Sequence, residues 1–310
     1  MKTCTIICNL YSGKGMKLKE LHNLVPLFEK YGYKPDIYIT EYQGHAKEIT
    51  KKLKYTDLVV SIGGDGTFNE VISGNFARKE QLVITHLPVG TTNDVGVMFG
   101  LSKNMRQNVI SVLKGEIKQV DIGIINKHPF MYVAAFGMLV AVTYETPRKL
   151  KKAWGYLAYA YRAVKEIFKK PRVYEIEYTI DNIKYTGAYS LILVSNATRI
   201  AGFNDVHKDV KLNDDKLEIA LFKKTKANDI LSSVIKLKLD GIDKVPGIEF
   251  HRASNIKIKF LKEPKKHWSI DGEELLDDNK DINISVDKQI PMLLPKKNID
   301  KLFINDKKED

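Results

Sequence analysis

Short apolar stretches alternate with stretches of helical spacing along the first third of the chain. Apolar runs typical of buried strands end near Asn9, Thr40, Ile62 and Leu87. Between them, apolar residues recur every three or four positions, as in amphipathic helices. The pattern predicts strands at 5–9, 36–40, 58–62 and 82–87 and helices at 18–31, 46–53 and 69–76. This alternation favours a parallel sheet with helices on both faces, in which ligands bind at the loops after the strands.

From about Asp121 the pattern changes to strands without intervening helices. Apolar and polar residues alternate at 174–180 and again at 256–260, which is typical of antiparallel strands with one face in solvent. The second half of the chain is therefore expected to be β-rich and antiparallel.

These patterns predict two domains and a tail. The first domain, 1–124, is α/β with a parallel sheet flanked by helices, and the second, 125–295, is β-rich and sandwich-like. Residues 296–310 form a charged tail, which is expected to pack back on the first domain through 302–304.

The loop after the third predicted strand contains Gly63-Gly64-Asp65-Gly66-Thr67. Its glycines would let backbone N–H groups approach phosphate oxygens, and the N-terminus of the following helix would add partial positive charge. The alternative is a tight turn between strand and helix, which would not require aspartate and threonine here. The sequence therefore predicts a phosphate-binding loop.

Two further polar loops follow predicted strands. One is Pro88-Val89-Gly90-Thr91-Thr92-Asn93-Asp94, and the other runs from Asn9 to Gly15. The carboxyl ends of parallel strands meet at one edge of a sheet, so all three loops are expected to converge. Taken alone, the first of these two would be an ordinary turn and helix cap. The sequence has no G-x-x-x-x-G-K-[ST] motif, which excludes a P-loop protein.

The net charge of +12 is concentrated in one segment. Residues 148–172 hold nine basic side chains against one acidic side chain, Glu166. Apolar residues recur on one helical face of this segment, at Trp154, Leu157, Tyr161, Val164 and Phe168. A basic amphipathic helix suits an anionic membrane surface. The alternative is that the apolar stripe belongs to the core and the charges form a solvated face.

The 310 residues, 44% of them hydrophobic, are enough for packed cores, which excludes a disordered protein. No apolar run is long enough to span a membrane, and the N-terminus lacks a signal-peptide pattern, so we expect a cytosolic protein. Cys4 and Cys8 lie on one face of the first predicted strand. They are expected to be structural thiols rather than a metal pair.

The three loops resemble those of the diacylglycerol kinase catalytic family. Further stretches resemble its soluble bacterial members nearly end to end, at 144–147, 196–203 (NATRIAGF), 211–215 and 271–273. Two residues depart from the family pattern. Leu10 stands where the family often has proline, and Val97 stands where an arginine commonly follows the second loop.

The resemblance implies ATP as the phosphoryl donor and a set of residues around the nucleotide. Thr40 belongs to this set, and its place at a strand end suits the role. The full set is Asn9, Leu10, Tyr11, Ser12, Gly13, Thr40, Gly63, Gly64, Asp65, Gly66, Thr67, Phe68, Asn69, Glu70 and Thr91.

The resemblance also implies Mg²⁺ as a cofactor. Asp65, Asp94 and Asp121 match acidic positions near the catalytic ion, with contact expected through water, and magnesium favours carboxylates and retained waters. The alternative for Asp121 is a solvated carboxylate at a strand end.

A second, structural magnesium is implied for the segment 211–216. Its ligands would be the carboxylate of Asp214 and the backbone carbonyls of Lys211 and Lys216. Asp215 stands where the family usually has glycine, and the alternative is a plain charged turn.

The resemblance assigns the general base to Asp271 or Glu273. A kinase acting on an alcohol benefits from a base within hydrogen-bond reach of the hydroxyl proton. These residues flank Gly272, and the choice between them stays open. Without the resemblance, Asp271-Gly272 would indicate a hairpin turn.

We therefore expect an ATP-dependent kinase that phosphorylates the free hydroxyl of diacylglycerol to form phosphatidate. Alternatives are a kinase of another lipid alcohol (sphingoid base, prenol or phosphatidylglycerol), an NAD kinase-like enzyme, and a nucleotide-binding regulator without transfer. The charge would suit nucleic acid, but no motif of a nucleic-acid-binding module is present. The expected partner is a lipid substrate at an anionic membrane surface, contacted peripherally from the cytoplasm at its inner face. A homodimer is one option for the assembly.

Overall fold

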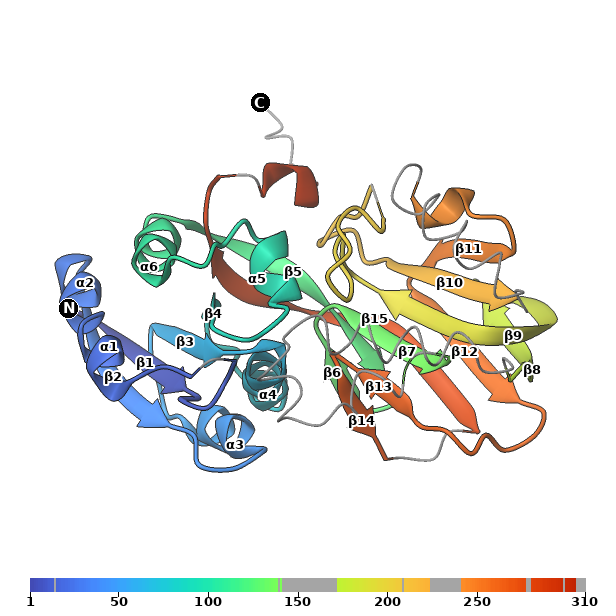
Figure 1. The fold of residues 1–310 in the computed structure, drawn as a ribbon, viewed down its shortest axis with the longest axis horizontal. Helices are drawn as coiled ribbons and strands as arrows, with labels where there is room; N and C mark the ends of the chain where they lie inside the picture. The colour runs from blue at the N-terminus through green and yellow to red at the C-terminus, as the bar shows by residue number, and fades with distance from the viewer. Residues whose placement is uncertain are drawn as a thin grey trace. The chain divides into compact units, whose positions relative to one another are not determined.

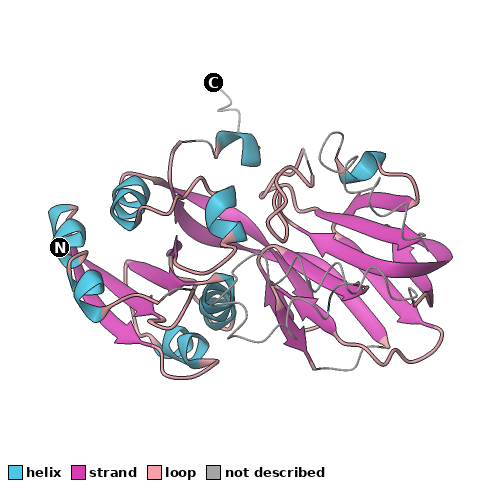
Figure 2. Cartoon of the chain, in the orientation of Figure 1, coloured by secondary structure: helices cyan, strands magenta, loops and turns pink. Residues whose placement is uncertain are grey.

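The computed structural model describes residues 1–13, 15–138, 140, 172–207, 209–223, 241–276, 280–297 and 299–304. The chain divides into two compact units. The first comprises 1–120, 211–214 and 289–310, and the second comprises 121–210 and 215–288. The path of the chain is shown in Figure 1, and Figure 2 shows helices among the strands of the first unit and mainly strands in the second.

The sheet of the first unit is parallel, as the sequence pattern predicts. Its strands are β1 (Lys2–Cys8), β2 (Tyr33–Ile39), β3 (Leu58–Gly63) and β4 (Ile84–Pro88). β1 pairs with β2 and β3, and β3 pairs with β4. The end of β15 (Asp281–Leu294) lies parallel to β4, with Met292 opposite Ile84. The three polar loops therefore leave the same edge of this sheet.

The helices of the first unit are α1 (Leu18–His22), α2 (Val25–Lys30), α3 (His45–Lys52), α4 (Asp65–Phe76), α5 (Asp94–Met98) and α6 (Met105–Leu113). The prediction of a single helix at 18–31 is wrong, because the structure has two helices there, separated by residues 23–24. Pro26 lies in the first turn of α2, where its missing N–H is tolerated, whereas inside a continuous helix it would break the backbone bonding. Helix α4 begins four residues before the expected start, because the glycine loop supplies its first turn.

Cys4 and Cys8 lie in the core that β1 forms with α1, α2 and α6. Both thiols are free, and burial raises the pKa of each to about 12. A thiol with so high a pKa stays protonated at neutral pH and is a poor nucleophile. Their burial in the core is what is expected of structural cysteines.

The second unit is β-rich and antiparallel, as predicted. Beyond the ends of β5 (Glu116–Ile125) and β15, its strands are β6 (His128–Phe130), β7 (Val133–Gly137), β8 (Tyr174–Ile180), β9 (Ile183–Ser195), β10 (Leu217–Lys223), β11 (Ile248–Ala253), β12 (Asn255–Phe260), β13 (Trp268–Ile270) and β14 (Glu273–Leu275). The long strand β9 pairs with β8 along its first half and with β7 and β10 along its second. Trp268, Phe136 and Phe260 pack in the core that these strands enclose.

The expected division at 124 and 295 differs from the units of the structure. Residues 121–124 belong to the second unit, and 211–214 and 289–295 belong to the first. The end of β15 is held there by the hydroxyl of Thr85, which donates to the carbonyl of Leu293 over 2.7 Å. In the tail, Leu302 and Phe303 are buried, and the N–H of Leu212 donates to the carbonyl of Leu302 over 2.7 Å. The tail and residues 211–214 are thus bonded to each other, although far apart in sequence.

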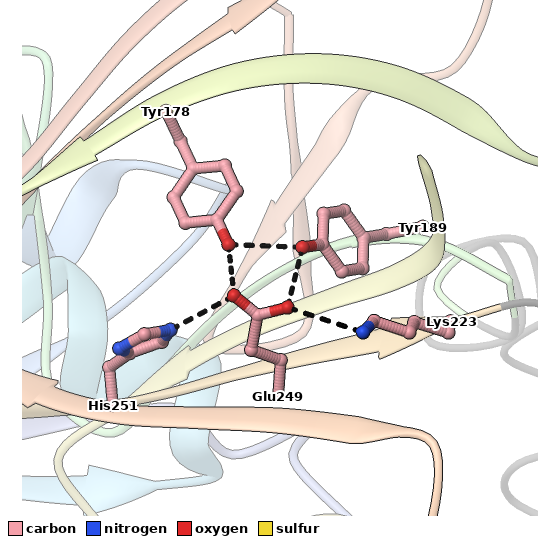
Figure 3. Close-up of polar contacts among 5 residues, drawn as sticks. All are labelled: Tyr178, Tyr189, Lys223, Glu249 and His251. Carbon is pink, nitrogen blue, oxygen red and sulfur yellow. Dashed lines mark hydrogen bonds and ion pairs between the residues drawn. The ribbon is translucent and has the colours of Figure 1, made fainter. Parts of the chain in front are cut away.

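A polar cluster lies at the edge of the core of the second unit, around the carboxylate of Glu249 on β11 (Figure 3). It accepts hydrogen bonds from the hydroxyls of Tyr178 and Tyr189, the latter over 2.8 Å, and Lys223 Nζ lies 3.7 Å away. His251 Nε2 is 3.3 Å from the same carboxylate. Burial alone would raise the pKa of Glu249, but these hydrogen bonds and the lysine charge lower it. The cluster ties β8, β9 and β11 together through one ionised side chain.

Candidate functional site

Three loops meet at the carboxyl edge of the first unit's sheet, and glycines allow the contact. A β-carbon on Gly13 would lie 2.1 Å from the carbonyl oxygen of Val89, and one on Gly90 would lie 2.7 Å from the α-carbon of Gly64. Both distances are far inside van der Waals contact, so a larger residue would force the backbone apart. The loops at 9–13, 63–67 and 88–94 therefore lie in contact with one another at this edge.

Hydrogen bonds join the first two loops through Asn9 and Thr67. Nδ2 of Asn9 donates to Oγ1 of Thr67 over 3.1 Å, and Oδ1 of Asn9 accepts the N–H of Tyr11 at 3.0 Å. Thr67 is buried, whereas Tyr11 is 82% exposed. Asn9 and Thr67 thus hold the loops in place, and the side chain of Tyr11 is left accessible to a ligand.

Asp65 joins the glycine loop to the loop after β4. Its carboxylate accepts the N–H of Asp94 at 3.3 Å, the N–H of Val95 at 3.4 Å and the hydroxyl of Thr92 at 3.3 Å. These N–H groups belong to the first turn of α5, so Asp65 caps that helix from another loop. The side chain is half-buried, and its bonds are long for hydrogen bonds to a carboxylate.

Of the other residues implied for the nucleotide, Ser12 and Gly66 are half-buried and Thr91 is exposed, all in the three loops. Leu10 packs against the core of the first unit. Thr40, just after β2, is buried, and its N–H donates to the carbonyl of Cys8 over 2.9 Å.

Phe68 and Asn69 of α4 lie in the interior of the first unit, and the half-buried Glu70 contacts α3. Phe68 and Asn69 are buried, and Phe68 stacks on His86 with ring centroids 4.5 Å apart. Glu70 accepts the N–H groups of Gly44 and Ala46 at 2.7 and 3.1 Å. Glu70 therefore caps the N-terminus of α3, a role that the sequence analysis missed.

The other two acidic positions implied for catalytic magnesium are more deeply buried than Asp65. Asp94 is 1% exposed and begins α5 in the first unit, and Asp121 is 0% exposed and begins the second unit. Oδ2 of Asp121 accepts the N–H of Asp215 at 2.8 Å. Asp65, the accessible carboxylate of the three, fits magnesium, which keeps several waters and takes few protein oxygens. Among the described residues, no group of three or more His, Cys, Asp or Glu gathers as in an enclosed metal cage.

The segment 211–216, implied as the structural magnesium site, forms a tight turn. Asp214 is half-buried, and Asp215 has a φ of 56°, in the left-handed region that favours glycine. The backbone therefore takes the conformation that the family's usual glycine would take, although aspartate is present. Asp214 and the carbonyls of Lys211 and Lys216 remain a prediction for the ion.

Asp271 lies in the turn between β13 and β14, where Asp271 and Gly272 have φ of 49° and 89°. The hairpin indicated by Asp-Gly is thus present. The carboxylate accepts the N–H groups of Met131, Tyr132 and Val133 at 2.7, 3.0 and 3.0 Å. Asp271 is 4% exposed, so it secures this hairpin to the segment before β7. Glu273, two residues on, is exposed.

Two residues of these sites had no role assigned from the sequence. Thr92 donates its hydroxyl to Asp65, and its place beside Thr91 in a polar loop was the available signal. Asn196, which is 0% exposed, donates Nδ2 to the carbonyl oxygen of Asp121 over 2.9 Å. Asn196 lies in the NATRIAGF stretch, but nothing local in the sequence connects it with Asp121.

The basic segment expected at 148–172 lies outside the described residues, apart from Arg172, and the stretch 144–147 lies outside them too. Within the described ranges, no helix has the length and apolar character needed to cross a membrane.

The sequence and fold were compared with known proteins. The family model of the diacylglycerol kinase catalytic domain matches residues 3–125. A diacylglycerol kinase of Bacillus subtilis (strain 168) is 31% identical over 277 residues, covering 88% of this chain and 90% of that protein. One of Staphylococcus saprophyticus is 30% identical over 275 residues, covering 88% of this chain and 89% of that protein.

The crystal structure of a diacylglycerol kinase from Bacillus anthracis str. Sterne has the same fold. It matches with a TM-score of 0.77 at 23% identity and covers 94% of this chain and 96% of that one. The family model covers all three converging loops, and each of the two relatives from Bacillus subtilis and Staphylococcus saprophyticus matches 88% of the chain. The chain belongs to the diacylglycerol kinase family and is a kinase.

Proposed function

We propose that this kinase transfers the γ-phosphate of ATP to the free hydroxyl of diacylglycerol, forming phosphatidate and ADP. The observation that carries the proposal is the contact of three glycine-bearing loops at one edge of a parallel sheet, in a chain whose relatives are named diacylglycerol kinases. Such a surface suits phosphates, because backbone N–H groups can approach their oxygens closely.

The nucleotide would lie against the three loops. Gly64, Gly66 and Ser12 would supply donors for its phosphates, with Thr91 at the open side. Thr67 and Asn9 would keep the first two loops in register through their mutual hydrogen bond. The loops would be supported by four further residues of the first unit, Thr40, Phe68, Asn69 and Glu70.

Magnesium, when bound, would neutralise charge on the phosphate oxygens. Asp65 would hold it through water, as the accessible carboxylate at this edge. Asp94 and Asp121 would add negative charge from buried positions. Asp214 with the carbonyls of Lys211 and Lys216 would hold a second ion that stabilises the turn.

We assign the general base to Glu273 rather than to Asp271. Asp271 already accepts three backbone N–H groups in a buried position, which uses most of its capacity as an acceptor. Glu273 is exposed and follows a turn that Asp271 secures. In the reaction, the acceptor oxygen would bond to the γ-phosphorus as the bond from that phosphorus to the bridging oxygen breaks. Glu273 would take the hydroxyl proton.

The test is transfer of labelled γ-phosphate from ATP with magnesium to diacylglycerol in anionic mixed micelles. Sphingosine, undecaprenol, phosphatidylglycerol and NAD serve as competing acceptors. Label in phosphatidate is expected, and Glu273→Gln should lower the rate by roughly 100-fold or more. If only another lipid were labelled, diacylglycerol would be the wrong acceptor, but the chain would still be a lipid kinase. Label in NAD, or in nothing, would overturn the lipid assignment.

A lipid acceptor requires the enzyme to reach a membrane. Peripheral attachment from the cytoplasm would satisfy this requirement. Sedimentation with and without vesicles would test that attachment.

A further inference from the structure

Asn196, the residue after β9, is bonded to two separate segments of the second unit. Its backbone N–H donates to the carbonyl oxygen of Tyr132 over 3.0 Å, and its Nδ2 donates to the carbonyl oxygen of Asp121 over 2.9 Å. Asn196 is 0% exposed, so the bond to Asp121 is shielded from water. One residue thus connects Asp121, on β5, with the segment that precedes β7.

The segment that precedes β7 also holds the hairpin of Glu273. The N–H of Tyr132 donates to Oδ1 of Asp271 over 3.0 Å. Asp271 lies in the turn between β13 and β14, and Glu273 begins β14, so the position of Glu273 depends on this bond. A series of hydrogen bonds therefore runs from the hairpin through Tyr132 and Asn196 to Asp121.

Within this series, only the bond from Asn196 to Asp121 depends on the asparagine side chain. The backbone N–H that donates to Tyr132 is present in every residue except proline. The carboxylate of Asp121 is held separately, by the N–H of Asp215 at 2.8 Å. Asn196→Ala would therefore release the backbone of Asp121 from Asn196 and leave the neighbouring bonds in place.

Two other buried asparagines use both ends of the side-chain amide. Asn75 donates Nδ2 to the carbonyl of Leu82 and accepts the N–H of Leu82 at Oδ1, both over 2.9 Å. Asn108 does the same with Ser102, over 2.8 and 2.9 Å. In Asn196, the buried Oδ1 has no hydrogen-bond partner among the residues that the structure describes. A buried acceptor without a partner is unfavourable for folding, so stability alone does not account for asparagine at this position.

We propose that Asn196 is a positioning residue for phosphoryl transfer, which fixes Asp121 relative to the hairpin of Glu273. The inference rests on the proposed function, in which Asp121 adds negative charge near the magnesium ion and Glu273 takes the proton of the acceptor. Both groups would act on one transfer, and a displacement of about 1 Å between reacting groups is enough to lower a rate severely. Asn196 itself would contact neither the nucleotide nor the acceptor.

The test is a double-mutant cycle on kcat, in the full chain, with Asn196→Ala, Asp121→Asn and both changes together. The acceptor is the lipid that the wild type labels most in the micelle assay. Asn196→Ala should lower kcat roughly tenfold and leave the KM for ATP within about twofold, because the three nucleotide loops are unchanged. The double variant should be no slower than the slower single variant, because Asn196 acts through Asp121.

The matched control is Asn75→Ala, which removes another buried asparagine. Asn75 bonds to Leu82, just before β4 begins, at the end of the strand opposite the polar loop. Asn75→Ala should lower the free energy of unfolding in urea but leave kcat within about twofold of the wild type. If Asn196→Ala does not fold, Asn196→Ser takes its place in the cycle, because its hydroxyl is one bond too short to reach the same carbonyl.

Three outcomes would overturn the positioning role: an unchanged kcat in Asn196→Ala, additive losses in the cycle, or an equal loss of kcat in Asn75→Ala. Additive losses would mean that Asn196 affects the rate independently of Asp121. A wild type that labels a lipid other than diacylglycerol would instead overturn the proposed acceptor alone, because the same cycle can be measured with that lipid.

Discussion

Asp65 and Asp271 both accept hydrogen bonds from backbone N–H groups of a segment distant in sequence, but they do so in different surroundings. Asp65 is half-buried, and its three bonds are 3.3 to 3.4 Å long. Asp271 is 4% exposed, and its bonds are 2.7 to 3.0 Å long. Short hydrogen bonds to a buried carboxylate hold the fold in place. Longer hydrogen bonds to a half-buried carboxylate leave its oxygens able to bind an ion as well. Under the proposed function, the comparison separates Asp65, which would serve the reaction, from Asp271, which would position Glu273.

The largest effect is expected for the reaction when Asp65 is changed to Asn. Loss of the charge that would hold magnesium should lower kcat by about 100-fold or more. The free energy of unfolding should change by less than about 1 kcal/mol, because the bonds are long and the amide oxygen can still accept. Steady-state kinetics and urea unfolding measure the two quantities. A large loss of stability with little loss of kcat would contradict the comparison, because Asp65 would then have the structural role given to Asp271.

Asp271→Asn should act mainly on stability. Asparagine suits the left-handed turn as well as aspartate does, so the turn itself is preserved. The amide N–H₂ would however face a backbone N–H that the carboxylate now accepts, and the free energy of unfolding should fall by about 2–4 kcal/mol. Urea unfolding followed by tryptophan fluorescence reports on this region, since Trp268 precedes the turn. The control is Glu273→Gln, which should leave stability within about 0.5 kcal/mol of the wild type.

Glu249 extends the comparison to pH, because it is a third carboxylate held by hydrogen bonds (Figure 3). Its pKa in the folded chain lies below the ordinary value of 4.5. Its contribution to stability is therefore complete above the unfolded pKa and is lost as pH falls through the folded pKa. Glu249→Gln should lower stability at neutral pH by about 1–2 kcal/mol and flatten the acid limb of stability against pH. Unchanged acid dependence in the variant would mean that other groups dominate that limb.

The same cluster also predicts a loss of stability at high pH. Burial and hydrogen bonding raise the pKa of Tyr178, and burial raises the pKa of Tyr189 to about 12. A tyrosine with a raised pKa stabilises the fold below its unfolded value near 10.0 and loses that contribution as pH rises. Tyr189→Phe should reduce this alkaline dependence in urea unfolding. Because the hydroxyl of Tyr189 also donates to Glu249, the same variant should weaken part of the acid dependence as well.

The smallest effect is expected at Asp215, whose N–H binds the buried Asp121 while its own φ is 56°. Asp215→Gly should relieve the left-handed strain and keep the backbone bond, for a gain of up to about 0.5 kcal/mol. Asp215→Ala should lower stability by about 1 kcal/mol instead. Thermal unfolding of the three proteins tests the order. If alanine were as stable as glycine, the turn would not carry the strain.

Local patterns predicted much of the fold because they depend on near neighbours in sequence. Alternation at 174–180 matches β8, and the buried run at 58–62 matches β3. The break between α1 and α2 was also legible, since Pro26 lies inside the expected helix. Periodicity averages over such single residues, and the break was missed for that reason.

Contacts between segments far apart in sequence were not predicted from local patterns. The end of β15 lies beside β4, and residues 211–214 bond to the tail. The local sequence pattern of one segment does not depend on the other, because each strand or turn would have the same pattern beside a different neighbour. At these places the compact units of the structure differ from the expected domain limits.

By itself, the sequence determined the class of each half, the three loops at one sheet edge and the residue types suited to phosphate. These follow from periodicity and glycine chemistry, which act over a few residues. Only the tertiary structure decided what each carboxylate does, because burial and bond length are set by segments distant in sequence, 29 residues away for Asp65 and Asp94 and 139 residues away for Asp271 and Tyr132.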